Sequence, residues 1–156
     1  MNTDVVNILT MAKVIQTAVA PVFLITGIAA TLGVLSNRLA RITDRARTLE
    51  RKLKTSSDED FNRSLTTELR ALLKRARYIH LAFSLSVLSA TLVSAVVMLL
   101  FMANIQSVNL GTAIALCFMI AMVLLILAFI SLLAEVYLAF RSMRRGMIFA
   151  DIDLGE

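Results

Sequence analysis

The sequence predicts an all-α integral membrane protein with three transmembrane helices and a cytoplasmic helical hairpin that extends the first and second spans. Hydrophobic residues make up 58% of the 156 residues, and the mean hydropathy is +0.80. A soluble domain of this size cannot bury so much apolar surface. Three stretches are each long enough to cross the ~30 Å hydrocarbon core of a bilayer, and a charged segment with helical periodicity separates the first two. The predicted segments are an outer N-terminal segment (1–13), the first span (14–36), a cytoplasmic basic helical hairpin (37–78), the second span (79–103), a short outer loop (104–109), the third helix (110–140) and a cytoplasmic C-terminal tail (141–156).

The three spans follow from runs of residues without formal charge. The first, 14–36, is too long for the apolar region of a signal peptide, and no basic segment precedes it. The second, 79–103, has His80 as its strongly polar member, near the cytoplasmic end. The third is the most apolar, and we expect its helix to continue through Glu135 to Phe140.

The distribution of basic residues predicts the orientation in the membrane. Segment 37–78 carries twelve Lys and Arg against six Asp and Glu, whereas the loop 104–109 has no charge. Basic loops stay in the cytoplasm, so the N-terminus is expected outside and the C-terminus inside. The net charge of +5 does not indicate nucleic-acid binding, because these basic residues flank membrane spans and lack interleaved aromatic residues.

The charged segment is predicted to fold as a hairpin of two helical arms. Ser57 or Asp58, followed by acidic residues, predicts the start of the second arm. Apolar residues recur at intervals of three and four on both arms, and we expect the two stripes to pack together. These residues are Leu35, Leu39, Ile42, Ala46, Leu49 and Leu53 on the first arm, and Phe61, Leu65, Leu69, Leu72, Ala76 and Ile79 on the second.

A different face of the first long helix carries small and weakly polar side chains within the span and basic side chains in the arm that follows. It comprises Gln16, Ala20, Phe23, Gly27, Ala30 and Val34 in the span, followed by Arg38, Arg41, Arg45 and Lys52. Arg38, Arg45 and Lys52 have no acidic residue three or four positions away, so the helix alone does not neutralise them. One interpretation is a pore with a cationic vestibule at the axis of a symmetric oligomer. The other is close helix packing above and contact with anionic lipid headgroups below.

Glu135 is the single acidic residue within the predicted helical apolar region. An ionisable group at such a depth normally has a partner or access to water. Arg38, Arg77 and His80 are the candidate partners near the cytoplasmic interface. Glu135 and His80 form the candidate intramembrane polar pair, with either a proton-linked role or a fixed interfacial one.

Enzymatic chemistry has little support in the sequence. There is no nucleophile–base motif, no phosphate-binding loop and no pair of intramembrane carboxylates. Cys117 is the single cysteine, so no second thiol is present for a disulfide or a cysteine metal site. We therefore expect no catalytic residue, no metal and no cofactor.

Several motifs also resemble a known family. The run IQTAVAPVFLITGIAATLGVLSNRLARITDRARTLE, then LLKRARYIHLAF and a third span closing in EVYLAFRSMR, resembles the uncharacterised three-span bacterial membrane proteins called domain of unknown function 2721. The resemblance extends from about Val14 to Arg145. Its most specific positions are Ala20, Pro21, Asn37, Arg38, Arg41, Asp44 and Arg45. It implies a bacterial inner-membrane location and brings no activity or catalytic residues.

Two functions are therefore expected from different classes. The first is a homo-oligomeric channel or pore that prefers anions and has a basic cytoplasmic vestibule. The alternative is a non-conducting membrane scaffold whose cytoplasmic hairpin binds a protein partner or anionic lipid. Charge reversal at Arg38 and Arg45 separates the two, because it changes ion selectivity in a pore and the binding of a partner in a scaffold.

Overall fold

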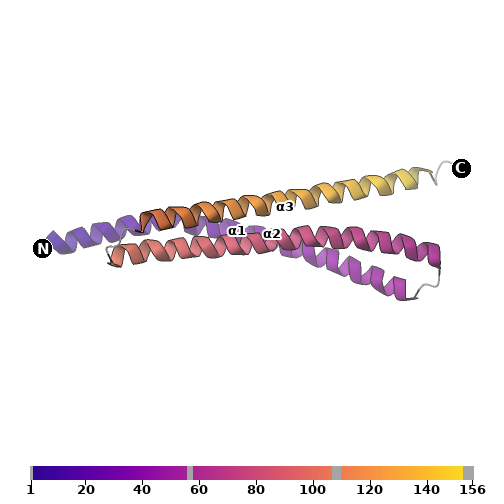
Figure 1. Ribbon diagram of the computed structural model, residues 1–156, viewed down its shortest axis with the longest axis horizontal. Helices are drawn as coiled ribbons and strands as arrows, with labels where there is room; N and C mark the ends of the chain where they lie inside the picture. The colour runs from indigo at the N-terminus through magenta and orange to yellow at the C-terminus, as the bar shows by residue number, and fades with distance from the viewer. Residues whose placement is uncertain (1, 56–57, 107–109, 153–156) are drawn as a thin grey trace. The chain divides into compact units, whose positions relative to one another are not determined.

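The described residues form three α-helices and no strand, and each helix contains a stretch long and apolar enough to cross a membrane. The computed structural model describes the backbone of residues 2–55, 58–106 and 110–152, and the side chains of 8–9, 11–55, 58–104 and 110–140. The helices are α1 (Asn2–Thr55), α2 (Glu59–Gln106) and α3 (Gly111–Ile152), drawn in Figure 1. Their most apolar windows have mean hydropathies of 2.2, 2.4 and 3.1, so the third is the most apolar, as predicted. The chain is a multi-pass membrane protein by helix length and composition.

Two of the helices join a predicted span to a predicted arm without a break. α1 includes the segment 1–13 from Asn2 onward and continues through Pro21 and the whole first arm. α2 begins at Glu59 because the side chain of Asp58 caps it. Asp58 Oδ1 accepts hydrogen bonds from the backbone N–H of Asp60 at 3.1 Å and of Phe61 at 3.4 Å. Of the two predicted starts, Asp58 therefore takes the capping role, and Ser57 lies outside the described residues.

Packing divides the chain into two units. Unit 1 comprises residues 1–33 and 84–127, and unit 2 comprises residues 34–83 and 128–156. The core of unit 1 contains many small side chains, a composition that lets membrane helices approach closely. Its buried residues include Ala18, Ile28, Ser86, Ser89, Val93, Val96, Ala121 and Leu125. Ser89 Oγ donates a hydrogen bond of 2.8 Å to the carbonyl oxygen of Ala121, which fastens α2 to α3.

Unit 2 contains the two arms, and the predicted stripes form its core. The buried residues Leu35, Ile42, Ile79 and Ala82 cluster together, with Leu39, Leu72, Ala76, Phe83 and Leu132 packed against them. Farther along the arms, Ala46, Leu49 and Leu65 are also buried. The packing of the two stripes is thus confirmed. Phe61, in the first turn of α2, is an exception, since it is 46% exposed.

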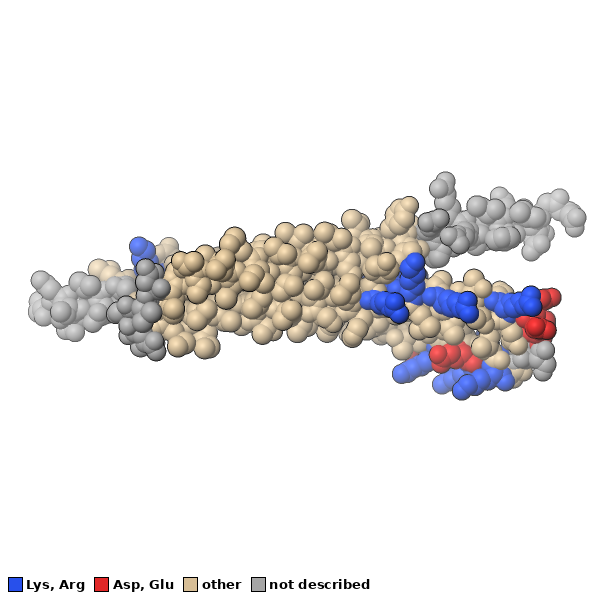
Figure 2. All heavy atoms as spheres, viewed as in Figure 1, with Lys and Arg blue, Asp and Glu red and all other residues tan. Residues whose placement is uncertain are grey.

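Charge is concentrated on unit 2. Among the described side chains of unit 1, Lys13 is the only Lys, Arg, Asp or Glu. Figure 2 shows blue and red side chains gathered over the arms of unit 2, and a broad surface without charge elsewhere. The arms therefore have the composition of a water-facing surface, and unit 1 has that of a lipid-facing one.

Candidate functional site

Glu135 is the most deeply buried charged residue among those that the structure describes. It is 1% exposed and lies on α3 in unit 2. Ala128 and Ser131 precede it at intervals of three and four residues on the same buried face. Ser131 Oγ donates a hydrogen bond of 2.9 Å to the carbonyl oxygen of Tyr78 on α2. This bond fixes α3 against α2 one turn before the carboxylate.

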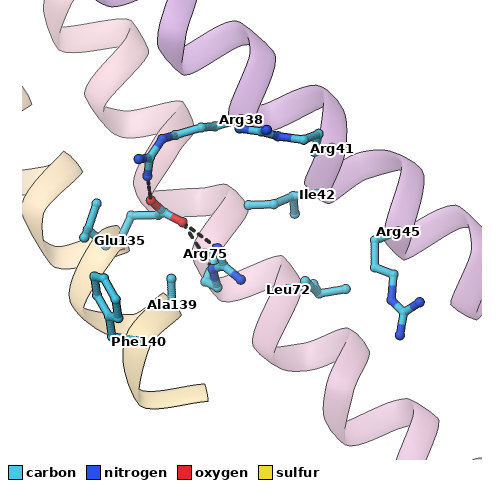
Figure 3. Close-up of a pocket in the computed structure, with 10 residues that line it drawn as sticks. Arg38, Arg41, Ile42, Arg45, Leu72, Arg75, Glu135, Ala139 and Phe140 are labelled. Carbon is cyan, nitrogen blue, oxygen red and sulfur yellow. Dashed lines mark hydrogen bonds and ion pairs between the residues drawn. The ribbon is translucent and has the colours of Figure 1, made fainter. Parts of the chain in front are cut away.

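Two arginines from different helices satisfy the carboxylate of Glu135 (Figure 3). Arg38 Nη1, from α1, donates to Glu135 Oε2 at 2.9 Å. Arg75, from α2, donates to Glu135 Oε1 through Nε at 3.1 Å and through Nη2 at 2.9 Å. The side chains of Arg38 and Arg75 remain 37% and 24% exposed. We call these three residues the arginine cluster. It ties the three helices of unit 2 together and carries one positive charge in excess.

The positions of the two arginines explain how they reach one carboxylate. Arg38 follows the buried Leu35 by three residues and precedes the buried Ile42 by four. Arg75 follows Leu72 by three residues, in the same relation to the stripe of α2. Residues at such spacing lie beside the apolar stripe and not opposite to it. Both guanidinium groups can therefore turn toward a third helix that packs on the hairpin.

The sequence predicted part of this arrangement. Arg38 was one of the expected partners of Glu135, whereas Arg75 was not among them. The ionic contacts of Glu135 in the described structure go to the two arginines, and His80 is exposed. The pairing of Glu135 with His80 is therefore replaced by the arginine cluster. The sequence signal for Arg75 was its position at the edge of an apolar stripe.

Two residues of the basic line of α1 have their partners on other helices, in agreement with the expectation that α1 alone does not neutralise them. Arg38 pairs with Glu135, and Arg45 donates to Glu68 Oε1 from Nε at 3.1 Å and from Nη2 at 2.9 Å. Both acids lie on other helices, so spacing along α1 alone does not reveal them. Arg41 and Lys52 are exposed, and neither has an ion-pair partner among the described residues.

A pocket of about 410 Å³ adjoins the arginine cluster (Figure 3). Its lining combines basic and apolar side chains from all three helices of unit 2. The lining residues are Arg38, Arg41, Ile42, Arg45, Leu72, Arg75, Glu135, Val136, Ala139 and Phe140. We call it the arginine pocket. With four arginines and one glutamate, it is suited to bind an anion that also has an apolar part.

The candidate pore-facing residues share one property in the structure. All six are exposed within the single chain: Gln16, Ala20, Phe23, Gly27 and Ala30 in unit 1, and Val34 in unit 2. Phe23 is 72% exposed, and a Cβ added to Gly27 would meet nothing within 4 Å. The chain therefore leaves this face of α1 uncovered. Its assignment to a pore stays a prediction.

The described side chains also bear on metal binding. These include no group of three or more His, Cys, Asp or Glu residues placed to hold a metal ion. Cys117 is a free thiol, half-buried on α3.

A family model matches most of the chain. The family model described as Protein of unknown function (DUF2721) matches residues 18–145. No curated protein and no solved structure matches the chain. The matched range includes the arginine cluster and every residue that lines the arginine pocket.

Proposed function

The chain belongs to the DUF2721 family, whose description names no activity, and from this premise we propose a function based on the geometry of the chain itself. We propose a homo-oligomeric pore of the bacterial inner membrane in which α1 lines the conduit. The N-terminus lies outside, and the charged arms of unit 2 face the cytoplasm. The positive-inside rule supports this orientation.

The contrast between two exposed faces of unit 1 carries the proposal. The exposed side chains of α3 in this unit are mostly large and apolar, as a lipid-facing surface requires. They include Leu116, Phe118, Met119, Ile120, Val123, Ile126 and Leu127. One exposed line of α1 instead combines Gln16, Ala20, Gly27 and Ala30 with the larger Phe23, and the apolar Ile15, Val19 and Val22 are exposed beside it. Small and weakly polar residues favour contact between membrane helices, so this face is suited to neighbouring subunits.

The proposed ion preference depends on the basic residues that have no ion pair. Arg38 and Arg45 are each held by a carboxylate. Arg41 and Lys52 have no ion-pair partner among the described residues and are exposed on the same helix. Rings of such residues around an axis would attract anions to the cytoplasmic entrance.

The first experiment measures assembly. Native mass spectrometry of the complex in nanodiscs, corrected for bound lipid, gives the subunit number. Ala30→Leu places a bulky side chain on the exposed face of α1, and Ala115→Leu makes the same change on the exposed surface of α3. We expect a closed ring of four or more subunits that Ala30→Leu dissociates and Ala115→Leu leaves intact. A wild-type monomer or dimer would reject the pore.

The second experiment measures water access and selectivity. In a Cys117→Ala background, Phe23→Cys and Val22→Cys place thiols at neighbouring exposed positions that point in different directions. We expect a charged, membrane-impermeant thiol reagent to modify the Phe23 variant and to spare the Val22 variant. In bilayer recordings, Arg41→Glu should shift selectivity toward cations, whereas Arg47→Glu, with an equal charge change on the same arm, should not. Currents that none of these substitutions alters would place the conduit elsewhere.

A non-conducting scaffold is the second candidate, and the independent core of the arms favours it. Leu49 and Leu65 are buried within the hairpin, while Leu73 remains 55% exposed on its surface. A packed hairpin with exposed apolar residues is suited to dock a protein partner. An oligomer that carries no current in the recordings above would select this function.

A further inference from the structure

We propose that the arginine pocket is a binding site for the phosphate of an anionic membrane phospholipid, with an acyl chain lying along the apolar side chains of α3. The proposal concerns unit 2 alone. It assigns a ligand to a place where guanidinium groups and apolar side chains meet.

The charge of the pocket favours an anion. Four arginines and one glutamate line it. Glu68 neutralises Arg45 from outside the lining, so an excess of two positive charges remains. Both oxygens of Glu135 already accept hydrogen bonds from arginines. The carboxylate is therefore compensated, and the remaining N–H groups are free to bind another anion.

Those N–H groups are of the type that binds phosphate. Arg38 uses Nη1 toward Glu135, and Arg75 uses Nε and Nη2. Among the described residues, Nε and Nη2 of Arg38, Nη1 of Arg75 and the whole guanidinium of Arg41 have no hydrogen-bond partner. Guanidinium groups bind phosphate oxygens with paired, charge-assisted hydrogen bonds. Three arginines that converge on one pocket thus provide the donors that a phosphodiester needs.

The position of the pocket along the helices selects a lipid over a soluble anion. Arg38 is the first charged residue of α1 after a charge-free stretch that begins at Val14. Glu135 is likewise the first charged residue of α3. The pocket therefore lies where the apolar part of these helices ends, which is the level of lipid headgroups.

The apolar side of the pocket supports the same ligand. Val136, Ala139 and Phe140 line it, and Phe140 is 67% exposed. Leu133 and Tyr137 are each 68% exposed on the same part of α3. Inorganic phosphate would gain nothing from these side chains. Leu133 lies on the bilayer side of Glu135 and Phe140 on the cytoplasmic side. A phospholipid would therefore cover Leu133 with its acyl chain and Phe140 with its headgroup while its phosphate binds the arginines.

Arg41 allows a test that leaves the arginine cluster intact. It lines the pocket and has no ion-pair partner among the described residues, so Arg41→Ala breaks no salt bridge there. Arg47 is exposed on the same arm and is absent from the lining, so Arg47→Ala is a control with the same charge change. Phe140→Ala shortens the apolar side of the pocket and keeps all four arginines.

The experiment measures the retention of dioleoylphosphatidylglycerol by the purified protein with native mass spectrometry. Salt at about 0.5 M screens diffuse attraction to the basic surface. We expect Arg41→Ala to weaken retention roughly tenfold, as the loss of a hydrogen bond to a charged group predicts. Arg47→Ala should change it by less than about twofold. Equal losses in the two variants, or a loss in neither, would overturn the pocket as a specific site.

A second set of measurements separates a lipid from a free anion. Inorganic phosphate, in large excess, should leave phosphatidylglycerol bound, and Phe140→Ala should lower its retention. Dioleoylphosphatidylcholine should be retained less than phosphatidylglycerol, because its choline cancels the phosphate charge. Displacement by inorganic phosphate, or retention unchanged by Phe140→Ala, would contradict a phospholipid ligand.

Discussion

Removal of the Glu135 carboxylate gives the strongest test of how unit 2 is held together. The substitution Glu135→Ala deletes the acceptor of three hydrogen bonds from two guanidinium groups. The glutamate side chain is 1% exposed, so water does not take its place without rearrangement. Both arginines then lose their anion, and their positive charges repel each other.

The size of the effect follows from burial. Breaking a fully buried ion pair by removing one partner destabilises a protein by about 3–5 kcal/mol. Arg38 and Arg75 keep side-chain exposures of 37% and 24%, so each can turn partly toward water. We therefore expect Glu135→Ala to lower the free energy of unfolding by a smaller amount, about 2–3 kcal/mol. Glu135→Gln keeps one acceptor oxygen and should lose about 1–2 kcal/mol.

Substitution of the two arginines should destabilise the protein to different extents. Arg75→Ala removes two hydrogen bonds from the less exposed partner, whereas Arg38→Ala removes one from the more exposed partner. Arg75→Ala is therefore the more destabilising change.

Unfolding by sodium dodecyl sulfate in mixed micelles, followed by circular dichroism, measures these free energies. Glu50→Ala is the control, because Glu50 is exposed and should change the unfolding free energy by less than about 0.5 kcal/mol. If Glu135→Ala were no more destabilising than this control, the cluster would contribute nothing to stability. A reversed order of the two arginine variants would refute the assignment of hydrogen bonds.

Three further substitutions test the packing and the helix cap. In the same assay, Leu49→Ala should lower the free energy of unfolding by about 3 kcal/mol, because the side chain is 2% exposed. Leu73→Ala, at 55% exposure, should lower it by less than about 0.5 kcal/mol. Similar losses in the two variants would show that the stripe is not a core. Asp58→Ala should destabilise the start of α2 by about 1 kcal/mol, seen as faster amide exchange in its first turn, and unchanged exchange would argue against the cap. Ser89→Ala should lower the free energy of unfolding by only about 0.6 kcal/mol, the average for a hydrogen bond between membrane helices. A loss above about 2 kcal/mol would mean that the substitution disrupts more than the hydrogen bond to Ala121.

Local patterns in the sequence are sufficient to predict the helices and most of the buried residues of the hairpin core. Apolar runs without charge predict the spans, and the spacing of Leu35, Ile42 and Ile79 predicts the buried stripes, because helix periodicity decides which side chains share a face. The acidic start of α2 similarly predicts its cap at Asp58. Each of these inferences concerns residues that are neighbours along one helix.

The arginine cluster could be predicted only in part, because it depends on contacts between helices. Glu135 stood out as a charge in an apolar run, and Arg38 was a nearby basic residue. Arg75 lies 60 residues from Glu135 in sequence, and no spacing rule joins the two. The pairing of Arg45 with Glu68 was missed for the same reason. Helix periodicity identifies a face, but the neighbour of that face depends on the fold.

The matched positions of Arg38 and Arg75 beside their stripes have a consequence for alignment. Stripes of leucine and isoleucine repeat about every seven residues, so the two arms could slide past each other by two turns, about 11 Å, and still bury apolar side chains. After such a slip, the guanidinium of Arg38 or that of Arg75 would no longer reach the carboxylate of Glu135, which accepts both in the structure. The slipped state would leave a charge without a partner near an apolar region, at a penalty of several kcal/mol. One carboxylate between two arginines thus selects a single alignment among several that hydrophobic packing alone would accept.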